Sequence, residues 1–266
     1  MANGSGLKIG IVGGAGWLGG AIAAALLDAG IAAPGDLALS YRSSCPGNLP
    51  GVFWTADNQA LADHSDIVIV SVRPADWEQI KLDAKGKLVI SVMAGIRLTA
   101  LAERHNTRRI VRTLPNAAAE VRKSYTPWIA TNDVTDADRA IVRSIFDACG
   151  VQDEMRTEAE IDYLTGLTGS GPAFPALLAA AMMADAIAHG LDRDVARRAV
   201  NTLLVGAGRL LEQKDDCPDE TVKTFLDYRG TTAAAIEGMT AAGFGTAVAQ
   251  GLSAAFEKSV RMGDIP

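Results

Sequence analysis

The sequence predicts an α/β fold in two parts, an N-terminal domain built on a doubly wound β-sheet and an all-helical C-terminal domain. Short apolar runs alternate with helical patterns up to about residue 155, which is typical of right-handed β-α-β units. Beyond residue 158 every patterned segment is helical. A chain of 266 residues is long enough for two domains that each have a core. We therefore expect domains at residues 1–156 and 157–266.

The strands of the first domain are expected to be short and buried. Ile67–Val72 is apolar along nearly its whole length, which indicates a strand covered on both faces, as in a parallel sheet. The predicted strands are Leu7–Val12, Leu37–Ser40, Ile67–Val72, Leu88–Val92, Arg109–Thr113 and Trp128–Thr131. Helices are predicted over Leu18–Ala29 and Thr135–Cys149, each followed by a glycine of the kind that commonly ends a helix.

The second domain is predicted to be a set of helices. They are expected near Glu158–Leu167, Pro172–His189, Arg193–Glu212, Asp219–Leu226, Thr231–Ala241 and Thr246–Val260. The helix from Pro172 carries Ala and Met on nearly all sides, so it must be buried within a domain or between subunits. Its apolar run is interrupted by Asp185 and is shorter than a membrane span requires. We predict a homodimer, or a larger homo-oligomer built from dimers, and no membrane contact.

Composition argues against several other classes of protein. The net charge is −6, and no cluster of Lys and Arg suggests a nucleic-acid partner. The arginines within residues 104–112 are read as a helix end followed by a strand. Residues 1–7 show no signal peptide, which favours a cytoplasmic protein.

Cysteine and histidine spacing predicts free thiols and no metal site. The cysteines are odd in number and far apart, so no disulfide framework is indicated. They are Cys45, Cys149 and Cys217. No two histidines have the spacing of metal ligands, and each is expected at the surface or at a helix end. They are His64, His105 and His189.

The most informative motif is Gly14–Gly19, which has the pattern G-x-G-x-x-G. It follows a predicted strand and opens a predicted helix, the context that distinguishes a dinucleotide-binding loop from an ordinary glycine-rich turn. Gly14 permits the tight turn, Gly16 lets the backbone approach the pyrophosphate, and Gly19 allows close helix–strand packing. The helix N-terminus then offers N–H groups to the phosphates. We predict a Rossmann-type domain whose cofactor loop includes Gly14, Gly16, Trp17, Leu18 and Gly19.

The end of the second strand indicates which dinucleotide binds. NAD-binding domains usually carry Asp or Glu there for the ribose hydroxyls, and residues 39–44 contain neither. Arg42 offers a guanidinium to a 2′-phosphate, and Ser43 and Ser44 add hydroxyl groups. The alternatives are that Arg42 is a solvated turn residue, or that Tyr41 or Arg42 stacks on adenine. NADPH is therefore the predicted cofactor, with NADH as the alternative.

Further segments, taken in order, resemble the pyrroline-5-carboxylate reductase family along nearly the whole chain, from Lys8 to about Arg261. The most specific is Leu164–Ala173, where the family has Ser-Gly-Ser-Gly-Pro-Ala. The others, besides the glycine loop, are Asp57–Asn58 with His64–Val68, Ser71–Pro74, Ser91–Ile96, Arg112–Asn116 and Gly230–Thr232. The resemblance implies a Rossmann domain, an intersubunit helical dimer, and reduction of a cyclic imine carboxylate to proline by NAD(P)H.

The resemblance also implies roles for individual residues. Asn58 would contact the adenosine ribose. The nicotinamide side would be lined by Val72, Arg73, Pro74, Ala94 and Gly95. The substrate carboxylate and ring nitrogen would be held by Gly230, Thr231 and Thr232.

Three segments depart from the family pattern. Asp227–Thr232 reads Asp-Tyr-Arg-Gly-Thr-Thr where the family has Ser-Pro-Gly-Gly-Thr-Thr. Asn116–Ala118 replaces Asn-Thr-Pro, and Val121–Lys123 stands where the family often has Gly-Glu-Gly. The first change lies where the substrate carboxylate is expected, so it bears on which imine is the substrate.

Hydride transfer to a C=N bond requires mainly that cofactor and substrate be positioned. The helix predicted from Thr231 would present its first N–H groups to a carboxylate. We assign Thr232 as the catalytic residue because its hydroxyl can hydrogen-bond the developing amine, and a helix cap is its alternative role. Arg229 is expected either to bind the carboxylate directly or to be a solvated loop residue. Ser170 is expected either to contact substrate or to serve helix packing.

Three functions are consistent with these residues. The first is NADPH-dependent reduction of 1-pyrroline-5-carboxylate to L-proline. The second is reduction of another cyclic imine or keto acid, such as a piperideine carboxylate or a ketimine, which Tyr228 and Arg229 favour. The third is an NADPH-binding regulator without turnover, which Thr232 and the intact helical domain disfavour. The natural imine and the physiological direction stay open at this point.

Overall fold

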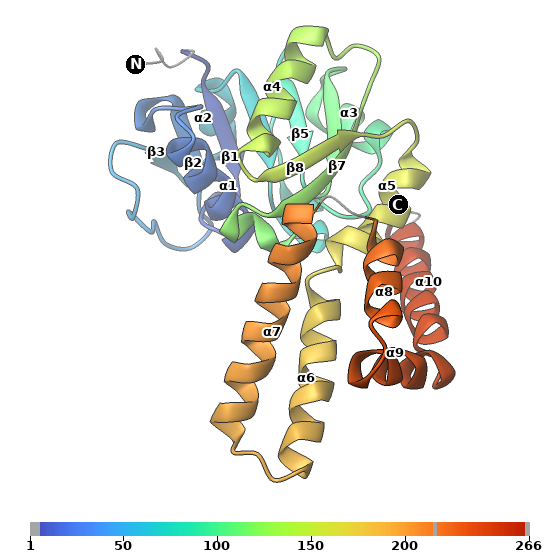
Figure 1. The fold of residues 1–266 in the computed structure, drawn as a ribbon. Helices are drawn as coiled ribbons and strands as arrows, with labels where there is room; N and C mark the ends of the chain where they lie inside the picture. Colours follow the sequence, from blue (N-terminus) through green and yellow to red (C-terminus); the bar gives the residue numbers. More distant parts are fainter. Residues whose placement is uncertain (1–5, 215–216, 264–266) are drawn as a thin grey trace. The chain divides into compact units, whose positions relative to one another are not determined.

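The computed structural model describes residues 6–214 and 217–263, which form two compact units (Figure 1). Unit 1 comprises the described residues up to Ser170 together with those from Ala255 onward, and unit 2 comprises those of Gly171–Ala254. The sequence-based boundary at residue 157 follows the last strand, whereas unit 1 also includes the next helical segment and the end of the last helix. The division of roles at residue 157 therefore stays a prediction. Residues 1–5, part of the segment expected to carry no signal peptide, lie outside the described residues.

Unit 1 is built on one eight-stranded sheet with the order β3-β2-β1-β4-β5-β6-β7-β8. The strands are β1 (Ile9–Val12), β2 (Leu37–Ser40), β3 (Phe53–Thr55), β4 (Ile67–Val70), β5 (Leu88–Ser91), β6 (Ile110–Thr113), β7 (Ser124–Ala130) and β8 (Gly150–Glu154). All neighbouring strands are parallel except β6 and β7. The predicted strands and the predicted α/β fold class are confirmed.

The sequence pattern misses two strands and shortens a third. β3 has three residues whose side chains are exposed or half-buried, so it contains no buried apolar run. β8 reads Gly-Val-Gln-Asp-Glu at the edge of the sheet, where one face and one side remain in contact with water. The segment predicted as Trp128–Thr131 is the second half of β7, which starts at Ser124 and runs antiparallel to β6. Buried Ser124 and Thr126 hide its first half from a hydrophobicity pattern.

Helices cover both faces of the sheet, as a doubly wound fold requires. They are α1 (Trp17–Asp28), α2 (Asn58–Asp63), α3 (Leu98–His105) and α4 (Asp136–Asp147), with 3₁₀ turns η1 (Pro34–Asp36), η2 (Pro74–Gln79) and η3 (Ala117–Val121). Unit 1 also contains α5 (Glu158–Leu164) and a π-helical turn, η4 (Thr165–Gly169). Along β4, Ile67 and Ile69 join a core with α1 and α4, whereas Val68 and Val70 join a second core with α2 and α3. Side-chain alternation along the strand thus divides one apolar run between two cores.

A buried ion-pair network explains why α5 belongs to unit 1. The guanidinium of Arg112 on β6 is 1% exposed and donates to Asp162 at 2.6 Å and to Glu158 at 2.9 Å. Arg97 donates to the other carboxylate oxygen of Asp162 at 2.7 Å. Charges this deeply buried require partners, so α5 must pack against the end of β6.

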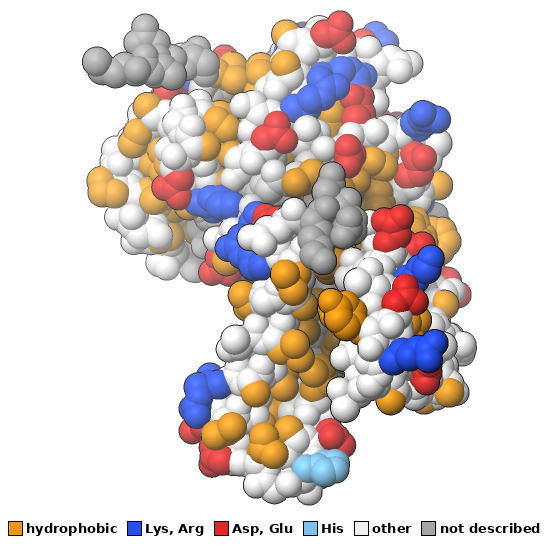
Figure 2. Space-filling model, viewed as in Figure 1, with side chains coloured by type: hydrophobic (Ala, Val, Ile, Leu, Met, Phe, Trp, Pro, Cys, Tyr) orange, Lys and Arg blue, Asp and Glu red, His pale blue; other side chains and the backbone are white. Residues whose placement is uncertain are grey.

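Within the part of the chain that the structure describes, unit 2 consists of helices. They are α6 (Ala173–Ala188), α7 (Arg193–Lys214), α8 (Pro218–Asp227), α9 (Thr231–Ala241) and the first part of α10 (Phe244–Gly263). Apolar side chains gather on the open surface of α6 and α7 (Figure 2). Leu177 is 73% exposed and Val205 is 67% exposed, and no residue of α6 is buried. Helices this apolar need a further protein surface to cover them.

The helical run around α6 is longer than the sequence pattern indicates. The segment Glu158–Ala188 contains α5, η4 and α6, and its most apolar 18-residue window has a mean hydropathy of 1.4, so by length and composition alone it could cross a membrane. The expectation that the apolar segment is too short is therefore wrong. A single run of this kind is weak evidence for a membrane span, because a helix buried between subunits has the same composition.

Candidate cofactor and substrate sites

The glycine loop connects β1 directly to α1. Gly13 adopts φ +79°, so the tight turn depends on Gly13 rather than on Gly14 as predicted. Gly14 is required for a different reason, because a Cβ atom there would lie 2.8 Å from the Cβ atom of Leu39 on β2. The hydroxyl of Ser40 accepts a hydrogen bond from the Gly13 N–H at 2.9 Å, which ties the turn to β2.

Gly16 and Gly19 shape the start of α1. Gly16 is the N-cap residue, and no side chain caps this end. A Cβ atom on Gly19 would lie 2.6 Å from the carbonyl oxygen of Gly13, which is the close helix–loop packing that the motif predicts. The first turn of α1 carries no acidic residue of its own, and its N–H groups and helix dipole favour a phosphate. This cradle fits the pyrophosphate of a dinucleotide.

Trp17 and Leu18 follow directly in the first turn of α1. Leu18 packs against the core that α1 shares with the sheet. The indole of Trp17 is 57% exposed, and its N–H donates to the carboxylate of Glu120 on η3 at 3.1 Å. Sequence reasoning misses this partner of Trp17, because Glu120 lies 103 residues away along the chain.

The end of β2 leads into Arg42 and Ser43, both of which are exposed. The guanidinium of Arg42 lies 3.7 Å from the carboxylate of Asp76, a residue that the sequence pattern does not indicate.

Asn58, expected at the adenosine ribose, is the first residue of α2, directly after its N-cap Asp57. The carboxylate of Asp57 accepts from two backbone N–H groups of α2, so it already has hydrogen-bond partners.

The residues expected on the nicotinamide side follow two adjacent parallel strands. Val72, Arg73 and Pro74 follow β4, while Ala94 and Gly95 follow β5. The N–H of Ser71 donates to Val12 at 2.9 Å, so this edge continues into the glycine loop. Gly95 adopts φ +79°, and a Cβ atom there would lie 2.7 Å from that of Met262. The carboxyl ends of β1, β4 and β5 thus form one continuous edge, where ligands of such sheets bind.

The residues expected to hold substrate lie at the start of α9 in unit 2. Gly230 is the N-cap with φ +97°, so Thr231 and Thr232 are the first residues of the helix and do not cap it. The alternative role of Thr232 as a cap is therefore wrong. Both threonines are exposed, and no side chain satisfies the N–H groups of this turn. Arg229 adopts φ +56°, a left-handed conformation that is costly for a residue with a Cβ atom.

Ser170 belongs to unit 1, unlike the other candidate substrate residues. It ends the π-helical turn η4, and its N–H donates to Thr165 at 3.1 Å. Gly169 before it packs closely against Leu114, because a Cβ atom there would lie 2.7 Å from the end of the Leu114 side chain. Asn116 donates to the carbonyl of Thr168 at 2.9 Å and holds the turn. These contacts favour the packing role for this segment.

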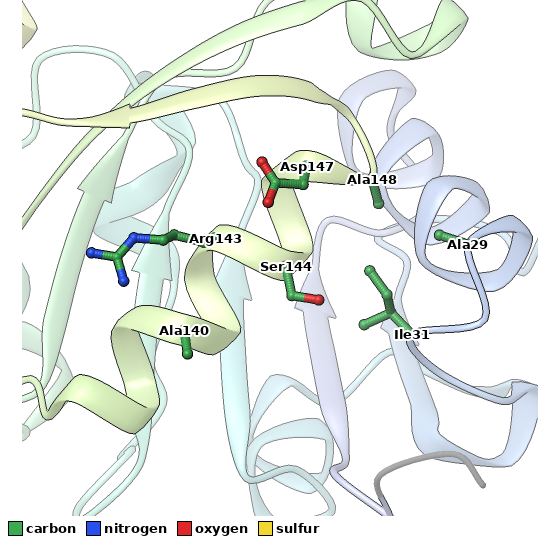
Figure 3. Close-up of a pocket in the computed structure, with 7 residues that line it drawn as sticks. All are labelled: Ala29, Ile31, Ala140, Arg143, Ser144, Asp147 and Ala148. Atoms are coloured by element: carbon green, nitrogen blue, oxygen red, sulfur yellow. The ribbon is translucent and has the colours of Figure 1, made fainter. Parts of the chain in front are cut away.

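A shallow pocket of about 520 Å³ lies away from all of these residues. It is formed by the end of α1 with Ile31 and by one side of α4, including Ser144 and Asp147 (Figure 3). None of the predicted site residues lines it. We therefore assign the pocket no part in the predicted chemistry.

The histidines all lie at helix ends, as predicted. His64 and His189 are C-cap residues, and His105 is the last residue of α3. His105 is fully buried, and burial lowers its pKa, while Arg104 lowers it further and a backbone hydrogen bond opposes the shift. Within residues 6–214 and 217–263, no group of three His, Cys, Asp or Glu side chains is placed to hold a metal ion.

Two regions of the chain match known family models. Residues 158–262 match the model described as pyrroline-5-carboxylate reductase dimerisation, and residues 8–95 match the one described as NADP oxidoreductase, coenzyme F420-dependent. The pyrroline-5-carboxylate reductase of Methanosarcina acetivorans is 30% identical over 96% of this chain and 98% of that protein. The pyrroline-5-carboxylate reductase of Pseudomonas aeruginosa is also 30% identical, over 91% of this chain and 93% of that protein.

Solved structures have the same fold. A pyrroline carboxylate reductase of Plasmodium falciparum with NADP bound has a TM-score of 0.86 and 25% identity, over 98% of this chain and all of that one. A pyrroline-5-carboxylate reductase of Coxiella burnetii has a TM-score of 0.88 at 24% identity, over the same share of both chains. Because relatives at 30% identity match almost from end to end, the chain belongs to the pyrroline-5-carboxylate reductase family.

Proposed function

We propose that the protein reduces 1-pyrroline-5-carboxylate to L-proline with NADPH, as a step of proline biosynthesis. The observation that carries this proposal is the family membership along nearly the full chain. The glycine cradle at α1 supports it, because a Cβ atom on Gly14, Gly16 or Gly19 would lie 2.6–3.0 Å from atoms of the loop or of β2, so this close-packed turn favours glycine at all three positions. The lack of a carboxylate at the end of β2, with Arg42 in its place, supports NADPH over NADH.

The reaction adds a hydride to the carbon of a C=N bond and a proton to its nitrogen. When bound, NADPH supplies the hydride. The N-terminus of α1 binds the diphosphate, and Arg42 and Ser43 bind the adenosine phosphate. The N-terminus of α9 binds the substrate carboxylate through the N–H groups of Thr231 and Thr232. The hydroxyl of Thr232 hydrogen-bonds the ring nitrogen and orients its lone pair as the amine forms.

Arg229 supplies the remaining positive charge at the substrate carboxylate in this proposal. Its left-handed backbone supports a functional role, because strained conformations persist where function or surrounding structure requires them. The family has glycine at this position, and glycine adopts the same conformation without strain. A larger ring, such as a piperideine carboxylate, is the second candidate substrate, and the replacement of Pro-Gly by Tyr228 and Arg229 favours it.

The dimerisation match indicates a homo-oligomer. We infer a homodimer, or a larger assembly of dimers, because exposed apolar side chains on α6 and α7 need a covering surface. In this proposal residues 1–156 bind the cofactor and residues 157–266 bind substrate and the second subunit. A cytoplasmic location is supported by three cysteines that are all free, two of them exposed.

The decisive assay follows NADPH oxidation and product formation with five-membered and six-membered cyclic imine acids. We expect turnover with 1-pyrroline-5-carboxylate and release of L-proline. A higher kcat/KM for the six-membered acid would show that a piperideine carboxylate, rather than 1-pyrroline-5-carboxylate, is the preferred substrate. NADPH binding without oxidation by any imine acid would overturn the enzymatic proposal and favour a regulator.

A further inference from the structure

Arg42 and Arg73 both pair with the carboxylate of Asp76, close to the carboxyl ends of β2 and β4. The Nε atom of Arg73 lies 2.8 Å from Oδ2 of Asp76, and Nη1 of Arg42 lies 3.7 Å from Oδ1 of the same residue. The two arginine side chains are 79% and 74% exposed, whereas that of Asp76 is 26% exposed. Two guanidinium groups are therefore held close together, open to solvent, around a more covered carboxylate.

The position of this cluster relates it to the cofactor. Arg42 follows β2 and Arg73 follows β4, and these strands lie on either side of β1. The loop after β1 is the pyrophosphate cradle described above. In a doubly wound domain, the adenosine ribose binds beside the end of β2, where an arginine accommodates a 2′-phosphate. The cluster stands at the corresponding place in this sheet.

We propose that Arg73 binds the 2′-phosphate of NADPH together with Arg42, and that Asp76 is the counterion which this phosphate displaces. The inference rests on the proposed function and deepens it, because it names the residues that select NADPH over NADH. It moves Arg73 from the nicotinamide side, where the family resemblance places it, to the adenosine side. A phosphate with three oxygens can accept from both guanidinium groups, whereas a ribose hydroxyl cannot displace an ionised carboxylate.

Asp76 retains its charge under ordinary conditions. The hydrogen bond from Arg73 holds the pKa of Asp76 below its usual value, although desolvation opposes this, and the charges of Arg73 and Arg42 lower it further. Both arginines are therefore paired before the cofactor binds. Their attraction to the phosphate must exceed their attraction to Asp76, and this exchange is available only to a dinucleotide with a 2′-phosphate.

The test uses fragments that report only on the adenosine end. Calorimetry with the full chain compares 2′,5′-ADP with 5′-AMP, which differ in the 2′-phosphate alone. Arg73→Gln is expected to weaken 2′,5′-ADP binding by about tenfold or more, the usual effect of losing a charge-assisted hydrogen bond. The affinity for 5′-AMP is expected to stay unchanged. Asp76→Asn is expected to tighten 2′,5′-ADP binding severalfold, because the competing carboxylate is gone.

A matched control is Arg108→Gln, since Arg108 forms an exposed ion pair with Asp133 elsewhere in unit 1. It is expected to leave both affinities unchanged. Equal losses for both fragments in Arg73→Gln, or weaker 2′,5′-ADP binding in Asp76→Asn, would overturn the inference while leaving the proposed reductase intact. If neither fragment nor NADPH binds the unmodified protein, the cofactor assignment itself fails, and the inference fails with it.

Discussion

Gly19 in the first turn of α1 lies so close to Gly13 that a Cβ atom on Gly19 would be 2.6 Å from the Gly13 carbonyl oxygen. Both partners at this contact are backbone, so no flexible side chain can move aside. Gly19→Ala is therefore expected to displace the loop from α1, to lower the free energy of unfolding by about 1–3 kcal/mol, and to weaken NADPH binding. Denaturant unfolding and NADPH calorimetry measure the two effects.

Gly35→Ala provides the control for this substitution, because a Cβ atom at Gly35 meets nothing within 4 Å. It is expected to change neither property. Equal NADPH affinity in Gly19→Ala and the unmodified protein would show that the loop geometry is not needed for binding.

Arg112 and Asp162 form a buried ion pair that joins β6 to α5. Arg112→Met would leave Asp162 buried beside Arg97 alone and would remove the ion-pair partner of Glu158, which keeps only the Leu98 N–H. Removing one member of such a pair is expected to lower the free energy of unfolding by about 3–5 kcal/mol. Arg108→Met, at an exposed pair, is expected to change it by less than about 1 kcal/mol. Similar losses for the two variants would contradict the assignment of α5 to the buried network.

Arg229 allows stability and substrate binding to be separated. Arg229→Gly relieves the left-handed backbone, so it is expected to raise the free energy of unfolding by about 1 kcal/mol. The same change is expected to raise KM for the imine acid by about tenfold, because a charged hydrogen-bond donor is lost. Arg229→Ala keeps the strain and should affect only KM. An unchanged KM in both variants would assign Arg229 to the solvated loop.

His105 is expected to make stability depend on pH. Burial lowers the pKa of His105 in the folded state, whereas in the unfolded chain the imidazole has its ordinary pKa of about 6.5. The unfolded chain therefore binds more protons below that value, so stability is full at higher pH and falls as pH drops below about 6.5, with a slope of up to about 1.4 kcal/mol per pH unit. The slope decreases again below the folded-state pKa.

Unfolding of His105→Gln measured across this pH range tests the assignment. The variant retains a group that can accept from the indole N–H of Trp77, which lies 3.3 Å from Nε2 of His105. Its stability should be less dependent on pH than that of the unmodified protein. Identical slopes for the two proteins would assign the acid sensitivity to other groups.

The apolar surface of α6 gives a test of assembly. Leu177 is 73% exposed in one chain, so Leu177→Glu is expected to be tolerated in the monomer and to weaken the oligomer. Light scattering after size-exclusion chromatography measures the mass directly. Val151→Glu places the same charge on 60% exposed Val151 at the edge of the sheet and should leave the oligomer intact. An unchanged oligomer mass for Leu177→Glu would show that Leu177 does not lie in the subunit interface.

Local patterns account for the parts of the fold that sequence reasoning recovers. Apolar runs such as Ile67–Val70 and capped helices such as α4 form elements that their own residues favour. The residues of β3 and β8 do not by themselves indicate strands, because these short edge strands depend on pairing with a neighbouring strand rather than on an apolar run. The direction of β7 likewise follows from its register with β6, which no residue within β7 specifies.

The candidate site divides in the same way. The cofactor loop can be predicted from Gly14–Gly19 because the strand end, the turn and the start of the helix all lie within a few residues. Three other features depend on the folded sheet and cannot be read from neighbouring residues. Gly13 makes the turn, and Glu120 hydrogen-bonds Trp17. Arg42, Arg73 and Asp76 come together where their strands end.

By itself the sequence determined the fold class, the buried strands and the longer helices, and a dinucleotide loop followed by a helical domain. The tertiary structure alone decided which distant charges pair, which glycines are indispensable, and to which unit the π-helical turn belongs. The physical reason is range. Periodicity and turn chemistry act between neighbours in the chain, whereas burial, ion pairing and close packing act between groups that only the folded chain brings together.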